Sequence, residues 1–219
     1  MTYSLQFTEK MTGAFAFAEA DYRAGYELGG KTGNRLLFRL TIATDDVDRF
    51  VADREHPAAA TGYVQCDPLG GRLPVQQGAF NLFVDEGPAI RHMLYRLYFA
   101  DATGRPLTLA GFKDVRPGPL TAVWPETSTL YFRILDGHVP VADGGSGTTD
   151  GLVGSGILRI PPADFAWQLT TFRVRGPALS GRIRALDAFG QLFLSELWQV
   201  FGPVRRLPRG TGKKERRHD

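Results

Sequence analysis

The tripeptide Phe38-Arg39-Leu40 lies within the segment Leu36–Ile42 (Leu-Leu-Phe-Arg-Leu-Thr-Ile), and a close copy, Phe132-Arg133-Ile134, follows 94 residues later. Apolar and polar side chains alternate in both copies, which is typical of a β-strand with one buried face. Successive side chains of a strand point to opposite faces. The alternation therefore predicts that the aromatic and aliphatic residues face the core and that both arginines face outward.

Segments of the same kind recur between turn signals along most of the chain. The 26 glycines and 14 prolines leave few intervals long enough for helices, so a mainly β fold is expected. The predicted strands are Met11–Phe17, Leu36–Ile42, Gly62–Cys66, Gly78–Val84, Met93–Phe99, Leu107–Lys113, Thr129–Leu135, Gly156–Ile160 and Gln168–Val174.

Further matches support an internal repeat. Met11-Thr12-Gly13 is similar to Leu109-Ala110-Gly111. Gly62 and Phe80 correspond to Gly156 and Phe172, and all these matches lie at nearly the same offset in the sequence. Two copies, about residues 7–106 and 107–202, are the interpretation we favour over chance alternation. Joining two such units removes their exposed edges, so we expect residues 1–204 to form one closed or nearly closed antiparallel barrel of about 8–10 strands.

Helices are expected at three places. Thr44–Val51 has apolar residues at helical spacing after a candidate cap, Thr44, and Pro161–Phe165 can form a single turn. A longer amphipathic helix is expected from Ser180, with an apolar stripe that must pack against the barrel wall, a barrel mouth or a partner chain in a homodimer. We expect the barrel. The stripe consists of Ile183, Leu186, Phe189, Phe193, Leu197 and Val200.

Composition and charge limit the classes of partner. The chain is 43% hydrophobic and 22% charged, as in globular proteins, with no apolar run of the roughly 20 residues that span a bilayer. Residues 205–219 hold seven Lys/Arg against two acidic residues, whereas residues 1–204 carry a net charge of −2 (19 basic, 21 acidic). This tail is expected to be disordered and solvated, and no nucleic-acid partner is expected.

Cys66 is the single cysteine, so no internal disulfide can form. The first residues, Met1–Glu9, lack the basic and then long apolar pattern of a secretory signal. Both features favour a reducing, cytoplasmic location. Cys66 falls at an apolar position of a predicted strand and is expected to be a buried structural thiol.

The predicted register gives the barrel a mostly apolar interior, suited to a hydrophobic small molecule. The expected substrate-binding residues are Phe38, Leu40, Phe80, Leu82, Leu97, Phe132, Leu158 and Phe172. Polar inward positions are the catalytic candidates: Tyr95, Gln168, Thr170 and Lys113. The alternative is a filled core in which Tyr95, Gln168 and Thr170 hydrogen-bond one another or water. In that case Lys113 extends to the rim; it can also pair with Glu126 or Asp114.

Several kinds of site have no support in the sequence. The four histidines and one cysteine lack metal-ligand spacing, so no metal is expected. Gly144–Gly151 is glycine-rich but lacks the Gly-Lys-Ser/Thr of a phosphate loop, and a hairpin loop is the expected structure. Ser155 lies between glycines with no helix signal after it, unlike a hydrolase nucleophile. We expect no metal and no organic cofactor.

Five stretches together resemble a module appended to the flavin domain of actinobacterial cholesterol-oxidase-like (GMC-type) oxidoreductases. They are Gly62–Phe83, Gly111–Lys113, Trp124–Tyr131, Gly156–Ile160 and Phe189–Trp198. The likeness covers most of residues 7–202, and its motifs are moderately specific. This chain lacks the flavin domain, so the resemblance implies no oxidase activity.

A second comparison is architectural only. Freestanding β-barrels of similar size in polyketide pathways include cyclases that fold a polyene for a Diels–Alder cycloaddition, which needs no nucleophile, metal or cofactor. The favoured hypothesis is therefore such a cyclase of secondary-metabolite biosynthesis, with Tyr95 and Gln168 as hydrogen-bond donors. The alternatives are a non-catalytic steroid- or lipid-binding module that partners an oxidoreductase, and a filled structural barrel whose last helix mediates assembly.

Overall fold

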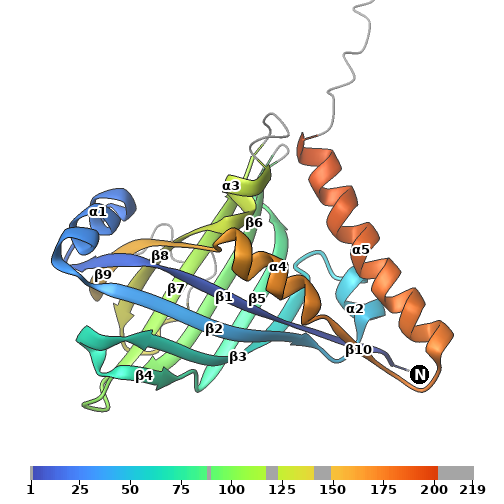
Figure 1. Ribbon diagram of the computed structural model, residues 1–219, viewed down its shortest axis with the longest axis horizontal. Helices are drawn as coiled ribbons and strands as arrows, with labels where there is room; N and C mark the ends of the chain where they lie inside the picture. Colours follow the sequence, from blue (N-terminus) through green and yellow to red (C-terminus); the bar gives the residue numbers. More distant parts are fainter. Residues whose placement is uncertain (1, 88–89, 117–122, 141–148, 202–219) are drawn as a thin grey trace, which may run out of the picture.

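The computed structural model describes residues 2–87, 90–116, 123–140 and 149–201. Eight antiparallel strands form a closed barrel, in which β9 returns to pair with β1 (Figure 1). The barrel strands are β1 (Ser4–Phe17), β2 (Arg35–Thr44), β3 (Pro57–Cys66), β5 (Gln77–Asp85), β6 (Arg91–Ala100), β7 (Pro106–Val115), β8 (Thr129–Asp136) and β9 (Leu152–Arg159). Two short strands pair at its edges: β4 (Gly71–Pro74) with β3, and β10 (Arg173–Arg175) with β1.

The barrel confirms the predicted fold class, and its registers match the predicted side-chain alternation. Phe38 lies opposite both Met11 and Val64 in the neighbouring strands, and all three side chains are buried. Phe132 and Ile134 of β8 are likewise fully buried. The apolar members of each alternating strand therefore face the lumen, as expected for a barrel of this strand number.

One side of β1 is incompletely paired with strands. β1 pairs with β9 over Thr12–Phe17 and with β10 over Ser4–Gln6, which leaves a gap in the wall between them. The helix α4 (Pro162–Thr170) lies along β1 at this gap (Figure 1). The Thr8 amide donates to Thr171 Oγ1 at 2.8 Å, and Lys10 forms an ion pair with Asp164 at 3.2 Å. The Thr171 hydroxyl thus takes the place of a strand partner for the Thr8 amide, and the ion pair fixes α4 beside β1.

The predicted strand Gln168–Val174 is therefore wrong over most of its length. Two prolines begin α4, and the helix continues past the single turn expected at Pro161–Phe165 to Thr170. Only Arg173–Arg175 is extended. Phe172, the proposed counterpart of Phe80, consequently lies outside any strand. The alternation of polar and apolar residues in this segment suggested a strand. A helix that packs on one side also has polar residues between its apolar ones, so the pattern did not distinguish the two.

Two further helices lie together at one end of the barrel (Figure 1). α2 (Val47–Ala52) is shorter than expected, and its cap is Asp46, which accepts from the Arg49 amide, in place of Thr44. α5 (Leu179–Phe201) begins one residue before the expected cap Ser180. It packs against α2, and Phe189 lies 6.1 Å from Phe50 between ring centroids.

The helix α1 (Tyr22–Thr32), which the sequence analysis did not predict, covers the outer face of β1 and β9. The glycines of this segment obscure the apolar spacing typical of a helix. Two of them nevertheless permit the helix to pack closely against the strands. A Cβ at Gly29 would lie 2.0 Å from the Phe15 carbonyl oxygen, and one at Gly25 would lie 2.2 Å from that of Ser155. Arg133 points outward as predicted, but Tyr22 of α1 covers it, with the guanidinium 4.8 Å from the ring centroid.

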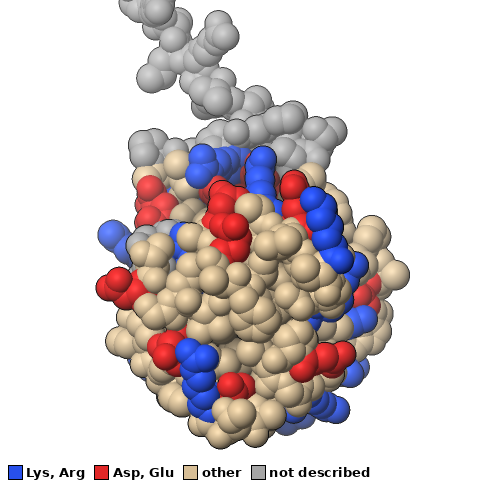
Figure 2. Space-filling model, turned by 90° about the vertical axis from the view of Figure 1, so that its left-hand side faces the viewer, with Lys and Arg blue, Asp and Glu red and all other residues tan. Residues whose placement is uncertain are grey.

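The barrel end that carries α1 faces the viewer in Figure 2. Acidic and basic side chains lie close together there, around an uncharged centre. Among the described helices, none is long and apolar enough to cross a bilayer. Cys66 is a free, buried thiol, and burial raises its pKa to about 11. The basic tail 205–219 and most of the loop Gly144–Gly151 lie outside the described residues.

Candidate functional site

A cavity of about 690 Å³ occupies the barrel end near α4 and α5, and its walls are mainly aromatic and aliphatic. The lumen contributes part of the wall, and α3 (Val123–Ser128), α4, α5 and the segments on either side of α4 contribute the rest. This volume lies in the range that holds drug-sized ligands. The lining residues are Phe7, Glu9, Phe80, Leu82, Met93, Tyr95, Lys113, Trp124, Thr127, Ser128, Ile160, Phe165, Gln168, Leu169, Phe172, Leu186, Phe189, Gly190, Phe193 and Leu194.

Three polar side chains from different strands meet at the inner end of this cavity. Tyr95 donates its hydroxyl proton to Glu9 Oε1 at 2.8 Å, and Lys113 Nζ donates to Glu9 Oε2 at 2.8 Å. Exposed fractions are 3% for Glu9, 1% for Tyr95 and 2% for Lys113. A buried charge requires a partner and hydrogen bonds, and here each charged group has both. We call Glu9, Tyr95 and Lys113 the floor triad.

The environment of Tyr95 keeps its hydroxyl protonated. Burial first, and then the Glu9 carboxylate, raise the pKa of Tyr95 well above its usual value. The Lys113 ammonium lies 5.2 Å from the centroid of the Tyr95 ring, at a distance suited to a cation–π contact. The Tyr95 ring also packs edge-to-face with the ring of Phe80, at 4.9 Å between centroids. The triad therefore lies between the cavity and the packed lumen, with contacts on both sides.

The structure brings six of the predicted site residues to the cavity wall. Tyr95, Lys113 and Gln168 are the polar ones, and Phe80, Leu82 and Phe172 are the apolar ones. Gln168 reaches the cavity from α4 and not from a strand, because α4 occupies the gap beside β1. The predicted partners of Lys113, Glu126 and Asp114, were wrong: its ion pair is with Glu9.

The other predicted site residues lie elsewhere. Thr170 ends α4, where its hydroxyl donates to the Trp167 carbonyl at 2.7 Å, and it is exposed. The remaining five are fully buried and fill the lumen beyond the floor triad, so the predicted hollow occupies only one end of the barrel. These five are Phe38, Leu40, Leu97, Phe132 and Leu158.

Glu9 is the central residue that sequence reasoning missed. The predicted first strand began at Met11, whereas β1 begins at Ser4. The alternation of Leu5, Phe7 and Met11 was available in the sequence and places position 9 on the inward face. A carboxylate on the inward face then requires a buried cation, and Lys113 was the inward cation already identified.

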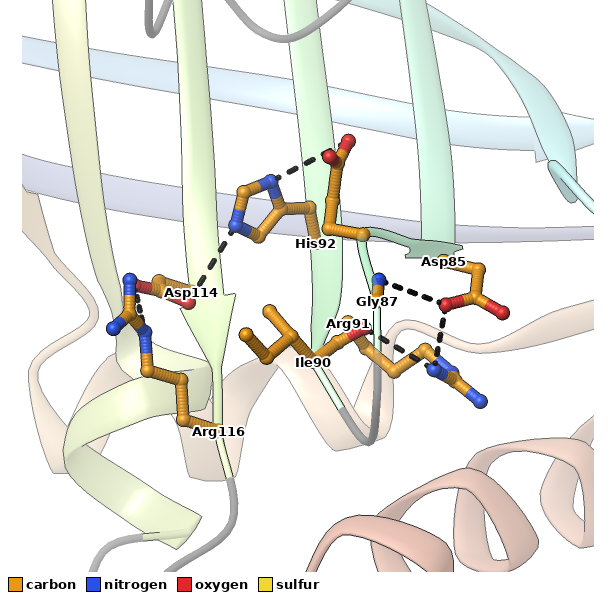
Figure 3. A network of polar contacts seen from close by, with 8 residues as sticks. Asp85, Gly87, Ile90, Arg91, His92, Asp114 and Arg116 are labelled. Atoms are coloured by element: carbon orange, nitrogen blue, oxygen red, sulfur yellow. Dashed lines mark hydrogen bonds and ion pairs between the residues drawn. The ribbon is translucent and has the colours of Figure 1, made fainter.

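An ion pair fixes α5 beside the cavity. Arg91, at the start of β6, contacts Glu196 of α5 through Nε at 2.9 Å, and it also contacts Asp85 at 3.2 Å. Figure 3 shows the Asp85 contact beside a second group, in which Asp114 accepts from Arg116 and faces His92. These contacts join the ends of β5, β6 and β7 to each other, and Arg91 joins them to the helix that forms the cavity wall.

The described residues contain no cluster of three His, Cys, Asp or Glu side chains arranged to hold a metal ion. The chain matches no family model, no curated protein and no solved structure. The candidate site is therefore defined by its own geometry: an apolar cavity with one buried, internally neutral polar triad at its inner end.

Proposed function

We propose that this protein is a cofactor-free cyclase that folds a hydrophobic polyene or polyketide in the cavity. The observation that carries the proposal is the position of the floor triad at the inner end of a roughly 690 Å³ apolar cavity. Such a cavity restricts a flexible chain to few conformers, and holding reacting groups together can supply several kcal/mol of barrier reduction.

The reaction class is an intramolecular cycloaddition of the Diels–Alder type. Four π electrons of a diene and two of an alkene become two new σ bonds and one new π bond, so the product is an isomer of the substrate. No proton, electron pair or leaving group needs to enter or leave the site. This reaction requires a cavity whose shape holds the reactive conformer, and one hydrogen-bond donor that polarises a carbonyl conjugated with the alkene.

Lys113 is the donor in this proposal. Its ammonium has three N–H groups, and Glu9 accepts from one of them. Tyr95, the donor favoured from the sequence, directs its proton to Glu9 and has the positioning role. The resulting order is that Tyr95 fixes Glu9, Glu9 fixes Lys113, and Lys113 donates to the substrate carbonyl.

A steroid- or lipid-binding module that partners an oxidoreductase is the second candidate. It is favoured by the mutual pairing of the floor triad, because polar groups that satisfy one another allow an apolar ligand to bind without any reaction. The resemblance to the appended module of GMC-type oxidoreductases points the same way and stays a prediction.

Gly190 provides a test of the cavity itself. It lies on α5 at the cavity wall, and an added Cβ meets no atom within 4 Å. Gly190→Phe is therefore expected to preserve the fold, extend a ring into the cavity and weaken binding of the fluorescent apolar probe Nile red. Gly30→Phe is the matched control, because Gly30 lies on α1 with equally open surroundings. Equal Nile red binding by both variants and the wild type would contradict both the cyclase and the binding-module proposals.

Lys113→Met then separates catalysis from binding. The substrate is a linear trienone, in which a diene and an enone are joined by a short saturated linker, and the product is detected as an isomer of equal mass. The wild type is expected to form one stereoisomer, and Lys113→Met is expected to reduce its rate by roughly 100-fold, the effect of losing one preorganised donor. Binding of the trienone by the wild type without conversion favours the binding module.

A further inference from the structure

Within the floor triad, only Lys113 keeps donors for a ligand, since one of its three N–H groups bonds Glu9. Glu9 accepts with both carboxylate oxygens, and the Tyr95 proton is directed to it. Glu9 and Lys113 are the charged residues among those that line the cavity, and they form an ion pair with each other. The described wall therefore carries no net charge, which disfavours an ionised ligand head group because no net opposite charge offsets its desolvation.

The Gln168 side chain is different from the triad. It lines the cavity, is only 8% exposed, and its Oε1 has no hydrogen-bond partner within the described part of the chain. Its main-chain carbonyl, in contrast, accepts from Thr171 Oγ1 at 2.7 Å and so stabilises the end of α4. An unpaired buried amide oxygen is costly, and a ligand that donates to it removes that cost.

We infer that Gln168 recognises a neutral polar end of the ligand that both donates and accepts hydrogen bonds, such as a primary amide, a lactam or a hydroxy-carbonyl group. A side-chain amide has one acceptor and two donors, so its complement is a group with a donor and an acceptor side by side. The apolar walls then hold the rest of the ligand. This inference rests on the proposed cavity function and names its substrate class.

Three probes that share one alkyl chain test the inference. Dodecanamide donates and accepts, N,N-dimethyldodecanamide only accepts, and dodecanoate is an anion at neutral pH. Affinities are measured by displacement of Nile red from the full-length protein. The wild type is expected to bind dodecanamide about ten-fold more tightly than either of the others, the effect of one hydrogen bond to a buried group.

Gln168→Met keeps the side-chain length and helix propensity and removes the amide. It is expected to bind the primary and the dimethyl amide about equally, and to unfold at a higher temperature than the wild type when no ligand is present, because the unpaired oxygen is gone. Gln191→Met is the matched control: Gln191 lies on α5, is exposed and bonds Asp187 at 2.8 Å. This control is expected to keep the wild-type preference.

The outcomes separate the two proposals. Equal wild-type affinity for the two amides, or tighter binding of dodecanoate, would overturn the assignment of Gln168 while leaving the cavity function intact. Absence of Nile red binding to the folded wild type would overturn the cavity function itself. The wild-type comparison of the two amides decides the matter even if Gln168→Met does not fold.

Discussion

The two ends of the barrel lumen are built from the same strands but differ in packing. At one end, large side chains such as Met11, Phe15, Phe38 and Phe132 leave no exposed surface. At the other end, aromatic side chains of the strands, such as Phe80, line a cavity of about 690 Å³ that residues of α5 also line. The Tyr95 ring, 5.8 Å from Phe38 and 4.9 Å from Phe80, lies at the boundary.

The difference shows that strand alternation alone does not create a cavity. Where β1 is paired with strands on both sides, the inward side chains meet and fill the lumen. Where α4 replaces a strand beside β1 and α5 lies across the end, some facing side chains still meet, such as Phe7 and Phe172 at 4.9 Å between ring centroids. A cavity nevertheless remains among them. A barrel of this strand number can be filled or can hold one ligand, and this one does each at a different end.

The largest expected effect comes from truncating the filled end. Phe132→Ala is expected to lower the free energy of unfolding by about 3–5 kcal/mol, because Phe132 is fully buried and its removal leaves a void. Leu194→Ala, at the cavity wall on α5 and 67% exposed, is expected to change it by no more than about 0.5 kcal/mol. Urea denaturation measures both. Similar losses for the two variants would contradict the contrast between the ends.

The floor triad is expected to give a somewhat smaller effect. Glu9→Leu leaves the Lys113 ammonium buried without its counter-ion. This is expected to lower the free energy of unfolding by about 3 kcal/mol. That value is near the lower limit for breaking a buried ion pair, because the cavity can admit water to the ammonium. The double variant Glu9→Leu/Lys113→Met removes both charges and is expected to be more stable than Glu9→Leu alone. A double variant less stable than either single variant would show that the pair is not the source of the loss.

The smallest expected effect on the free energy of unfolding comes from the alkaline ionisation of Cys66, which lies at the filled end. Burial raises its pKa from 9.0 to about 11, so between these values the unfolded thiol ionises while the folded thiol keeps its proton. The unfolded state then binds fewer protons, and stability falls as pH rises through this window; below pH 9 the group contributes nothing. Chemical denaturation of the wild type between pH 9 and 11 is expected to show a steeper decline than Cys66→Ala. Parallel declines would contradict this.

Much of the barrel was predictable because side-chain parity is a local property. The alternation around Phe38 and Phe132 assigned the inward face correctly, and the turns between strands carry their own glycine and proline signals. α1 was not predictable in this way. Gly25 and Gly29 lower helix propensity, and their value lies in contacts with strands distant in sequence.

The candidate site was predicted only in part. Tyr95 and Lys113 were found because parity places them inside, whereas Glu9 was missed because its strand was started too late. Gln168 was assigned to the interior through a strand that does not exist, and α4 brings it there by a different route. Parity gives the face of a residue but not its height along the barrel, so it could not separate Phe80 from Phe38.

The sequence by itself determined the antiparallel strands, the inward set of apolar residues, and the amphipathic character of the last helix, because each follows from the spacing of side chains along a short segment. Only the tertiary structure decided that Glu9 meets Lys113 and Tyr95, and that the lumen is filled at one end and hollow at the other. Those features depend on strand register around the closed barrel and on where α4 and α5 pack. Both are contacts between residues distant in sequence, which no local pattern specifies.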